Sequence, residues 1–411
     1  MNVKHFYYGY ILVIAGIIAS IFMVGTYTSF GIFFKPISLE LEWTRATTSG
    51  ATSLASLVMG VFSIVAGRLT DRYGPRLVLI ASGILMGLGN LLMSQTRVLW
   101  HIYVYYGVLI GAGMSASEIP IMTTIARWFV KRRGTMTGIT KVGAGIGIMV
   151  VPLLSGWLIS INGWRNAYLV IGVVALLSII SMALLYKRDP SEIGKLPDGD
   201  TMVVDNNIEQ GIKFSLGDVL RTRQFWMFTV SWFCFMFCLQ IVMVHIVNHV
   251  TDVGISSTIA ASVVSVIGGL SIAGRLGLAS LSDVIGRKTA YLIAFSFLAS
   301  AFLSLQFARE IWSFYLFGAL YGVAHGACFT LLPLMMARLF GTSSLGSVLG
   351  MILFFGTLGS LISPIFAGWV FDVTNSYLPA FWVGLGFSIL GLVLLVLLKP
   401  VKEIIISGDR L

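Results

Sequence analysis

Twelve long apolar stretches divide this chain of 411 residues, and they limit what it can fold into. A helix that crosses the hydrocarbon core of a bilayer needs about 20 apolar residues. In the first half of the chain, such stretches cover residues 8–34, 46–67, 77–96, 100–126, 134–160 and 165–186. In the second half, they cover residues 224–250, 257–281, 288–307, 311–337, 345–371 and 377–398. The sequence therefore predicts an all-α polytopic membrane protein with twelve transmembrane helices.

The composition excludes a soluble protein and gives no support to the common enzyme classes. Only 11% of the residues are charged, whereas soluble proteins contain about 25%. The usual motifs for binding phosphate or dinucleotides and for zinc-dependent or serine hydrolysis are absent from the sequence. Three cysteines without a CxxC pair predict neither a disulfide framework nor a metal site. We therefore expect neither an enzyme nor a cofactor.

Lysine and arginine predict the orientation of the chain. If both termini lie on one side of the membrane, the loops and tails on that side contain 20 Lys and Arg residues, and the opposite loops contain 5. Such an excess marks the cytoplasmic face. We therefore expect an integral protein of the cytoplasmic (inner) membrane with both termini in the cytoplasm. The net charge of +10 is then a topology signal, and no nucleic-acid partner is expected.

One long polar stretch, residues 187–223, separates two groups of six spans. It predicts a cytoplasmic linker whose last part, around Lys213–Arg223, forms a short interfacial helix. The expected domains are a six-helix bundle at 1–186, a second at 224–398, and a cytoplasmic tail at 399–411.

The two halves repeat each other. Asp71–Arg76 recurs as Asp283–Lys288, and Gly156-Trp157 recurs as Gly368-Trp369, both at an offset of 212 residues. Matches at one offset, in corresponding positions, indicate a duplicated six-helix unit.

Three charged residues lie inside the spans, away from the helix ends: Glu118, Lys141 and Arg275. Each costs about 2.5–3.5 kcal/mol at the bilayer centre, so such residues usually face a bundle interior or a water-filled cavity. At 1.5 Å per residue, all three lie roughly 12–13 Å from the cytoplasmic helix ends. Glu118 and Lys141 are on adjacent helices joined by a short loop, which favours an ion pair. The alternative is that Lys141 binds an anion as a second contact or takes part in proton coupling.

After that pairing, no further carboxylate inside the spans is left in the sequence to balance the charge of Arg275. We hypothesise that a substrate carboxylate balances its charge, because a guanidinium binds a planar carboxylate through two hydrogen bonds. The alternative is a structural arginine that binds backbone carbonyls or the Asp283 loop. Tyr321 and His325 in the tenth span, with Tyr27 in the first span as a weaker candidate, are expected to add hydrogen bonds to the substrate.

The segment Gly67–Arg76 resembles the loop between the second and third helices of the major facilitator superfamily. The resemblance implies that charged residues in this loop and its repeat latch neighbouring helix ends on the cytoplasmic side. These predicted gating residues are Asp71, Arg72, Arg76, Asp283, Arg287 and Lys288. The alternative is that these charges only fix the topology.

A closer resemblance is to the monocarboxylate porter and oxalate–formate antiporter branches of that superfamily. Gly31–Pro36, Trp43-Thr44-Arg45 and Asp252–Ile255 are similar to motifs of these branches, and Arg275 matches the position of their substrate arginine. The resemblance implies two pseudo-symmetric bundles that transport small monocarboxylates such as lactate or pyruvate by alternating access. It also implies symport with H⁺ by a monomer surrounded by lipid.

The sequence departs from these branches in ways that leave alternatives open. The span 345–371 has no Lys, Arg or His, although the oxalate–formate branch carries a second cation there. Ser271 and Thr28 occupy positions where animal monocarboxylate porters have Asp and Lys, so proton coupling through those groups does not carry over. An organic-anion exchanger and an exporter of amphipathic compounds therefore remain as alternatives. A sensor without transport activity is a further one, for which the linker and tails leave little room.

Overall fold

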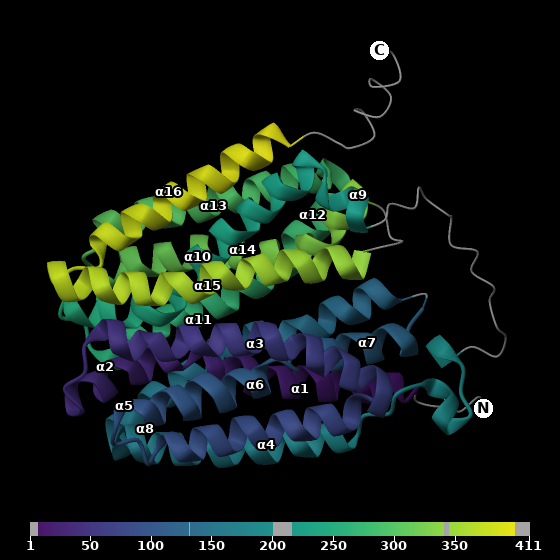
Figure 1. Ribbon diagram of the computed structural model, residues 1–411, viewed down its shortest axis with the longest axis horizontal. Helices are drawn as coiled ribbons and strands as arrows, with labels where there is room; N and C mark the ends of the chain where they lie inside the picture. The colour runs from purple at the N-terminus through teal and green to yellow at the C-terminus, as the bar shows by residue number, and fades with distance from the viewer. Residues whose placement is uncertain (1–6, 131, 200–215, 341–344, 399–411) are drawn as a thin grey trace. The chain divides into compact units, whose positions relative to one another are not determined.

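The computed structural model describes residues 7–130, 132–199, 216–340 and 345–398, and helices account for all regular structure in them (Figure 1). Eleven of these helical segments are long and apolar enough to cross a membrane. The predicted all-α polytopic fold is therefore confirmed.

The first half of the chain begins with four expected spans. The first consists of α1 (Gly9–Thr28) and α2 (Phe30–Glu40), the second is α3 (Arg45–Tyr73), and the third is α4 (Pro75–Met93). The fourth span is assembled from α5 (Leu99–Ile102), the π-helical segment η1 (Tyr103–Ile110), α6 (Gly111–Met114) and α7 (Ile119–Trp128). It is interrupted between α6 and α7, just before Pro120.

The fifth and sixth expected spans lie in one long element, α8 (Arg133–Leu184). Its 52 residues would measure about 78 Å as a straight helix, more than twice the hydrocarbon thickness of about 30 Å. Gly163 interrupts it with φ 73° and ψ 165°, a conformation that suits a residue without a side chain. The two arms on either side of Gly163 are the predicted spans 134–160 and 165–186. This interruption explains why eleven segments contain twelve predicted spans.

The linker and the second half follow the predicted order. Short elements come first: η2 (Pro190–Ile193), η3 (Pro197–Gly199) and α9 (Leu216–Leu220). The spans are α10 (Arg223–Asp252), α11 (Ser257–Ala273) with η4 (Gly274–Leu278) and α12 (Ala279–Ile285), α13 (Arg287–Phe307), α14 (Ile311–Phe340), α15 (Leu345–Thr374) and α16 (Leu378–Leu397). The short helix expected around Lys213–Arg223 corresponds to α9. Residues 200–215 of the linker and the tail 399–411 lie outside the described residues.

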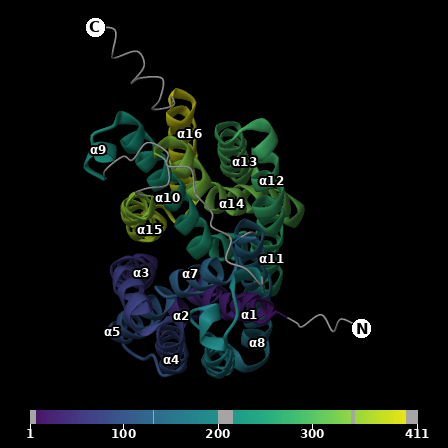
Figure 2. The same ribbon diagram turned by 90° about the vertical axis from the view of Figure 1, so that its right-hand side faces the viewer.

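Contacts divide the chain into two compact units. Unit 1 contains Met1–Asn206 together with Ile246–Gly269, and unit 2 contains Asn207–His245 together with Leu270–Leu411. The end of α10 and most of α11 therefore pack with the first half of the sequence. Figure 2 views α3 and α4 of unit 1 nearly end-on.

In unit 1, α8 packs along both α1 and α4, and α4 and α8 run side by side in Figure 1. One core cluster includes Trp128, whose indole N–H donates to the Lys187 carbonyl at 3.1 Å. Glycine allows a second close contact, because a Cβ atom at Gly111 would lie 2.8 Å from the Ala55 carbonyl oxygen. Gly111 thus lets the backbones of α6 and α3 approach closely.

Candidate functional site

Arg275 lies in unit 2 on η4, where the eighth span changes from α-helical to π-helical geometry. Its side chain is buried, and the residue is 7% exposed. π-Helical turns are rare and often occur at functional sites. Burial and an unusual local helix therefore coincide at the arginine that the sequence predicts to bind substrate.

Two glycines bring the helix of Arg275 against α14. A Cβ atom at Gly274 would overlap the backbone carbonyl of Val323, and one at Gly326 would overlap the carbonyl of Ser271. The backbones of the two helices therefore touch at this crossing. Arg275 follows one of these glycines and His325 precedes the other, so both residues lie at this crossing.

His325 is buried on α14, with its residue 4% exposed. Its ring stacks on Tyr321 at a centroid distance of 6.3 Å and an interplanar angle of 15°, and Phe329 meets it edge-on. The Nδ1 atom has no hydrogen-bond partner among the described residues. A buried imidazole nitrogen normally has a partner, so this atom is available to a ligand.

Tyr321 uses its hydroxyl group within the protein. The residue is fully buried, and the hydroxyl donates to the carbonyl of Leu239 at 3.1 Å and to that of Cys238 at 3.4 Å. Both acceptors belong to α10, so Tyr321 ties α14 to α10 and supports the ring of His325. Its predicted direct contact with substrate stays a prediction.

Glu118 and Lys141 form the expected ion pair inside unit 1, with Lys141 Nζ 2.9 Å from Glu118 Oε1. Glu118 lies at the interruption of the fourth span, immediately before α7, and Lys141 lies on the first arm of α8. The lysine side chain is 18% exposed and the glutamate side chain 55%. Because the helix is interrupted here, the Glu118 carboxylate is more exposed than we expected for a charge placed deep in the membrane. Pairing offsets part of the cost of placing these charges in the membrane.

We expect a double-mutant cycle to detect this pair. Glu118→Gln or Lys141→Met leaves one charge without its partner, so each should lower the melting temperature of the protein in detergent micelles. The double variant should lose less than the sum of the two, with a coupling free energy of about 0.5–3 kcal/mol. Additive losses would show that the two side chains do not stabilise each other.

Tyr27 lies in the packed interior of unit 1. Its ring stacks on that of Tyr106 at 5.8 Å and 19°, and its hydroxyl oxygen lies 3.3 Å from Ser56 Oγ. The Tyr106 hydroxyl in turn donates to the backbone carbonyl of Tyr27 at 2.8 Å. These contacts hold α1, α3 and η1 together, and 8% of Tyr27 remains exposed.

The predicted gating residues of the first repeat lie where α3 ends. Asp71 is 3.6 Å from Arg127, which closes α7 and also lies 3.4 Å from Asp189. Arg72 places its guanidinium carbon 5.2 Å from the ring centroid of the neighbouring Tyr73. Arg76 is exposed at the start of α4. Within the part of the chain that the structure describes, an ion pair connects Asp71, but neither Arg72 nor Arg76, to a neighbouring helix end.

The second repeat connects helix ends through backbone carbonyls. Arg287 donates to the carbonyl of Leu334 in α14 at 2.9 Å. Lys288 donates to the carbonyls of Val396 and Leu398 at 2.8 and 2.7 Å, where α16 ends. A cation at a helix C-terminus satisfies free carbonyls and the negative end of the helix dipole. The side chain of Asp283 lies outside the described residues.

An ion-pair cluster surrounds Asp252, which was not among the predicted site residues. This carboxylate is 2.8 Å from Lys35 Nζ and 2.6 Å from an Arg45 nitrogen. Lys35 also donates to the Thr251 hydroxyl at 3.2 Å. The cluster joins the end of α10, which belongs to unit 1, to α2 and α3. All three charged residues occur in the motifs quoted above, but no spacing in the sequence shows that they meet.

His245 is also bound within the protein, in unit 2. Its Nδ1 lies 3.1 Å from the Tyr377 hydroxyl and its Nε2 lies 3.0 Å from the Pro364 carbonyl oxygen. The carbonyl only accepts, so Nε2 carries the proton and Nδ1 accepts from the tyrosine. His245 therefore connects α10 to α15 and to the start of α16. In the described residues no three His, Cys, Asp or Glu side chains gather as metal ligands.

Comparisons with known proteins agree with this architecture. The model of the Major Facilitator Superfamily matches residues 16–305 and 250–408. Monocarboxylate transporter 13 of Bos taurus is 27% identical over 386 residues, covering 93% of this chain and 88% of the relative. The uncharacterized MFS-type transporter YhjX of Escherichia coli (strain K12) is 28% identical over 357 residues, covering 85% of each chain.

A solved structure shares the fold. A bacterial homologue of the human lysosomal transporter Spinster matches with a TM-score of 0.70 at 15% identity, covering 96% of each chain. Since the family model covers most of the sequence and the helices follow the same fold, the chain belongs to the Major Facilitator Superfamily and is a transporter.

Proposed function

We propose that this transporter carries small monocarboxylates of the lactate and pyruvate kind together with a proton. The observation that supports the proposal best is Arg275, a buried cation on a π-helical turn of a membrane-spanning segment. A charge at such a depth is expensive and by default marks a substrate or ion pathway.

The chemistry of Arg275 favours a carboxylate as its ligand. A guanidinium offers parallel N–H donors that match the two carboxylate oxygens, and the buried surroundings strengthen such charged hydrogen bonds. The absence of Lys, Arg and His from residues 345–371 argues against a second carboxylate, since a dicarboxylate needs a second cation. The names of the relatives, monocarboxylate transporters among them, support the same class of substrate.

The other candidate residues complete the proposed mechanism. His325 Nδ1, which has no hydrogen-bond partner among the described residues, can bind substrate or transfer a proton. Glu118 and Lys141 tune the charge of the pathway. Tyr321 and Tyr27 shape the site. In the proposed cycle two six-helix bundles, residues 1–186 and 224–398, rock about the site. Asp71, Arg72, Arg76, Asp283, Arg287 and Lys288 latch the cytoplasmic helix ends of a monomer whose termini both face the cytoplasm of the inner membrane.

Uptake into proteoliposomes tests the proposal. Radiolabelled lactate and pyruvate should accumulate faster with an inward proton gradient than without one, and a protonophore should remove the stimulation. If uptake does not depend on the proton gradient but becomes faster when the vesicles are preloaded with an anion, the mechanism is anion exchange and not symport. No uptake of either acid by folded protein would contradict the substrate assignment, and efflux of lipophilic dyes would then favour the exporter.

A further inference from the structure

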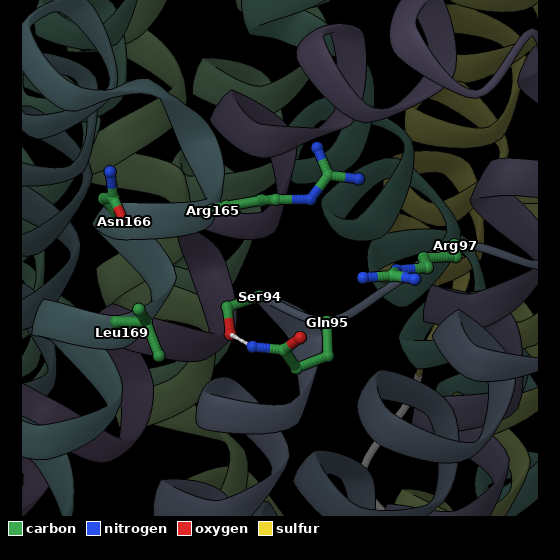
Figure 3. Close-up of a pocket in the computed structure, with 6 residues that line it drawn as sticks. All are labelled: Ser94, Gln95, Arg97, Arg165, Asn166 and Leu169. Carbon is green, nitrogen blue, oxygen red and sulfur yellow. Dashed lines mark hydrogen bonds between the residues drawn. The ribbon is translucent and has the colours of Figure 1, made fainter.

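A polar pocket lies at one end of unit 1, in a place that the transport mechanism does not use. It forms where the turn after α4 meets α8 just past Gly163, and its volume is about 190 Å³. The lining residues are Ser94, Gln95, Arg97, Arg165, Asn166 and Leu169. Figure 3 shows the side chains of Arg97 and Arg165 extending into the hollow from opposite sides, with the Gln95 side chain beside it.

The lining is rich in hydrogen-bond donors and carries positive charge. The lining contributes two guanidinium groups, two side-chain amides and one hydroxyl, and it includes no carboxylate. The Ser94 hydroxyl and the Asn166 amide donate to the carbonyls of Leu91 and Asn162, so the two arginines supply most of the donors left for a ligand. A nearby carboxylate, Glu40, forms an ion pair with Arg165 and neutralises one of the two charges. The remaining positive charge and the guanidinium donors suit an anionic oxygen-rich group such as a phosphate.

Arg165 is fixed in place before any ligand binds. Besides the ion pair with Glu40, it donates to the carbonyl of Thr96 at 3.1 Å. Its guanidinium carbon lies 4.1 Å from the ring centroid of Trp164, and the Trp164 indole N–H donates to Glu40 at 2.5 Å. An arginine held in this way loses little conformational entropy on binding.

The pocket also lies at the level where lipid headgroups are found. α4 crosses the membrane from Pro75 to Met93, so residues 94–97 stand at the membrane surface. Trp100, 59% exposed, provides the aromatic side chain typical of that interface.

An apolar row leads from the pocket along α8. Leu169 lines the pocket, and Val173 and Leu177 follow at intervals of four residues, so the three share one face of the helix. They are 38%, 45% and 61% exposed. Headgroup donors and an exposed apolar row next to them form the two halves of a phospholipid site.

We propose that this pocket binds the phosphate of an anionic phospholipid, with an acyl chain along Leu169, Val173 and Leu177. By the predicted topology the lipid comes from the outer leaflet. A guanidinium group binds phosphate oxygens through parallel N–H donors, whichever leaflet supplies the lipid. The pocket does not contain Arg275. A failure to bind lipid would therefore not contradict the proposed transport function, and a failure to transport lactate would not contradict the lipid site.

Native mass spectrometry of the full-length protein tests the lipid site. In an equimolar mixture of phosphatidylglycerol and phosphatidylcholine, the wild-type protein should retain phosphatidylglycerol preferentially. Arg97→Gln removes one charge and should lower that retention about fivefold, and Arg97→Glu should lower it about thirtyfold. Arg97 is the better position to change, since Arg165 also holds Glu40 and the loop at Thr96.

The matched control is Arg309→Gln, which changes another exposed arginine at a span end, in unit 2. This variant should keep the wild-type preference. Equal retention of the two lipids, or unchanged retention in Arg97→Glu, would overturn the proposal. Displacement of the lipid by millimolar inorganic phosphate or lactate, in a way that depends on Arg97, would also overturn it by assigning the pocket to a soluble anion.

Discussion

Arg275→Lys should lower gradient-driven lactate uptake at least tenfold, and Arg275→Ala should reduce it to the level of empty liposomes. A lysine keeps the charge but replaces two parallel N–H donors by one compact ammonium group. Removing one partner of a buried, hydrogen-bonded charge pair costs about 2–5 kcal/mol, which corresponds to a factor of about thirty or more in affinity. The measurement is the initial rate of uptake at several lactate concentrations, for proteoliposomes with equal amounts of protein.

A structural role of Arg275 would produce a different pattern. In that case both variants would melt at lower temperature or elute as aggregates, and lactate would stabilise the surviving folded protein as it does the wild type. If Arg275 anchors the substrate, the variants stay folded and lactate no longer raises their melting temperature. Arg309→Lys is the matched control, and its uptake should equal that of the wild type. Wild-type uptake by folded Arg275→Ala would refute the assignment.

The membrane-spanning segments were predictable from the sequence because their signal is local. Each span needs only its own apolar residues, so predicted ranges such as 311–337 agree with the observed α14 (Ile311–Phe340) within a few residues. The interruption inside α8 was predictable as well, because one predicted span ends at 160, the next begins at 165, and Gly163 lies in the gap between them. The extension of the first span to Glu40 was not predicted, because Lys35 and Pro36 interrupt the apolar stretch without ending the helix.

Contacts within the site were predictable only where the chain itself forces residues together. Glu118 and Lys141 are on adjacent helices with a short connection, and they pair as expected. Lys35 and Asp252 are 217 positions apart, and only the folded unit shows that they meet. Helical spacing also places Tyr321 one turn before His325, but it does not reveal that the tyrosine hydroxyl binds α10.

Gly326→Ala should prevent the correct packing of unit 2, although it adds a single methyl group. The new Cβ would overlap the backbone carbonyl of Ser271, and a backbone atom of a neighbouring helix has no rotamer through which to move away. Overpacking in a well-packed interior typically costs about 1–3 kcal/mol, and here two helices must separate to relieve it. We therefore expect a melting temperature several degrees lower in detergent micelles. Folded protein that remains should also have lost much of its lactate uptake, because the separation moves His325 away from Arg275.

Gly350→Ala provides the control, because it changes another helical glycine of unit 2, in α15. A Cβ there meets no described atom within 4 Å, and alanine is the better helix former by about 1 kcal/mol. This variant should therefore melt at or slightly above the wild-type temperature and transport normally. Both substitutions replace glycine by alanine, but they are expected to change the melting temperature in opposite directions. The difference between the two melting temperatures therefore reports the cost of the overlap at the helix crossing. If Gly326→Ala melts and transports like Gly350→Ala, the backbones of α11 and α14 do not touch at Ser271. The placement of His325 near Arg275, which follows from the same helix crossing, would then be wrong.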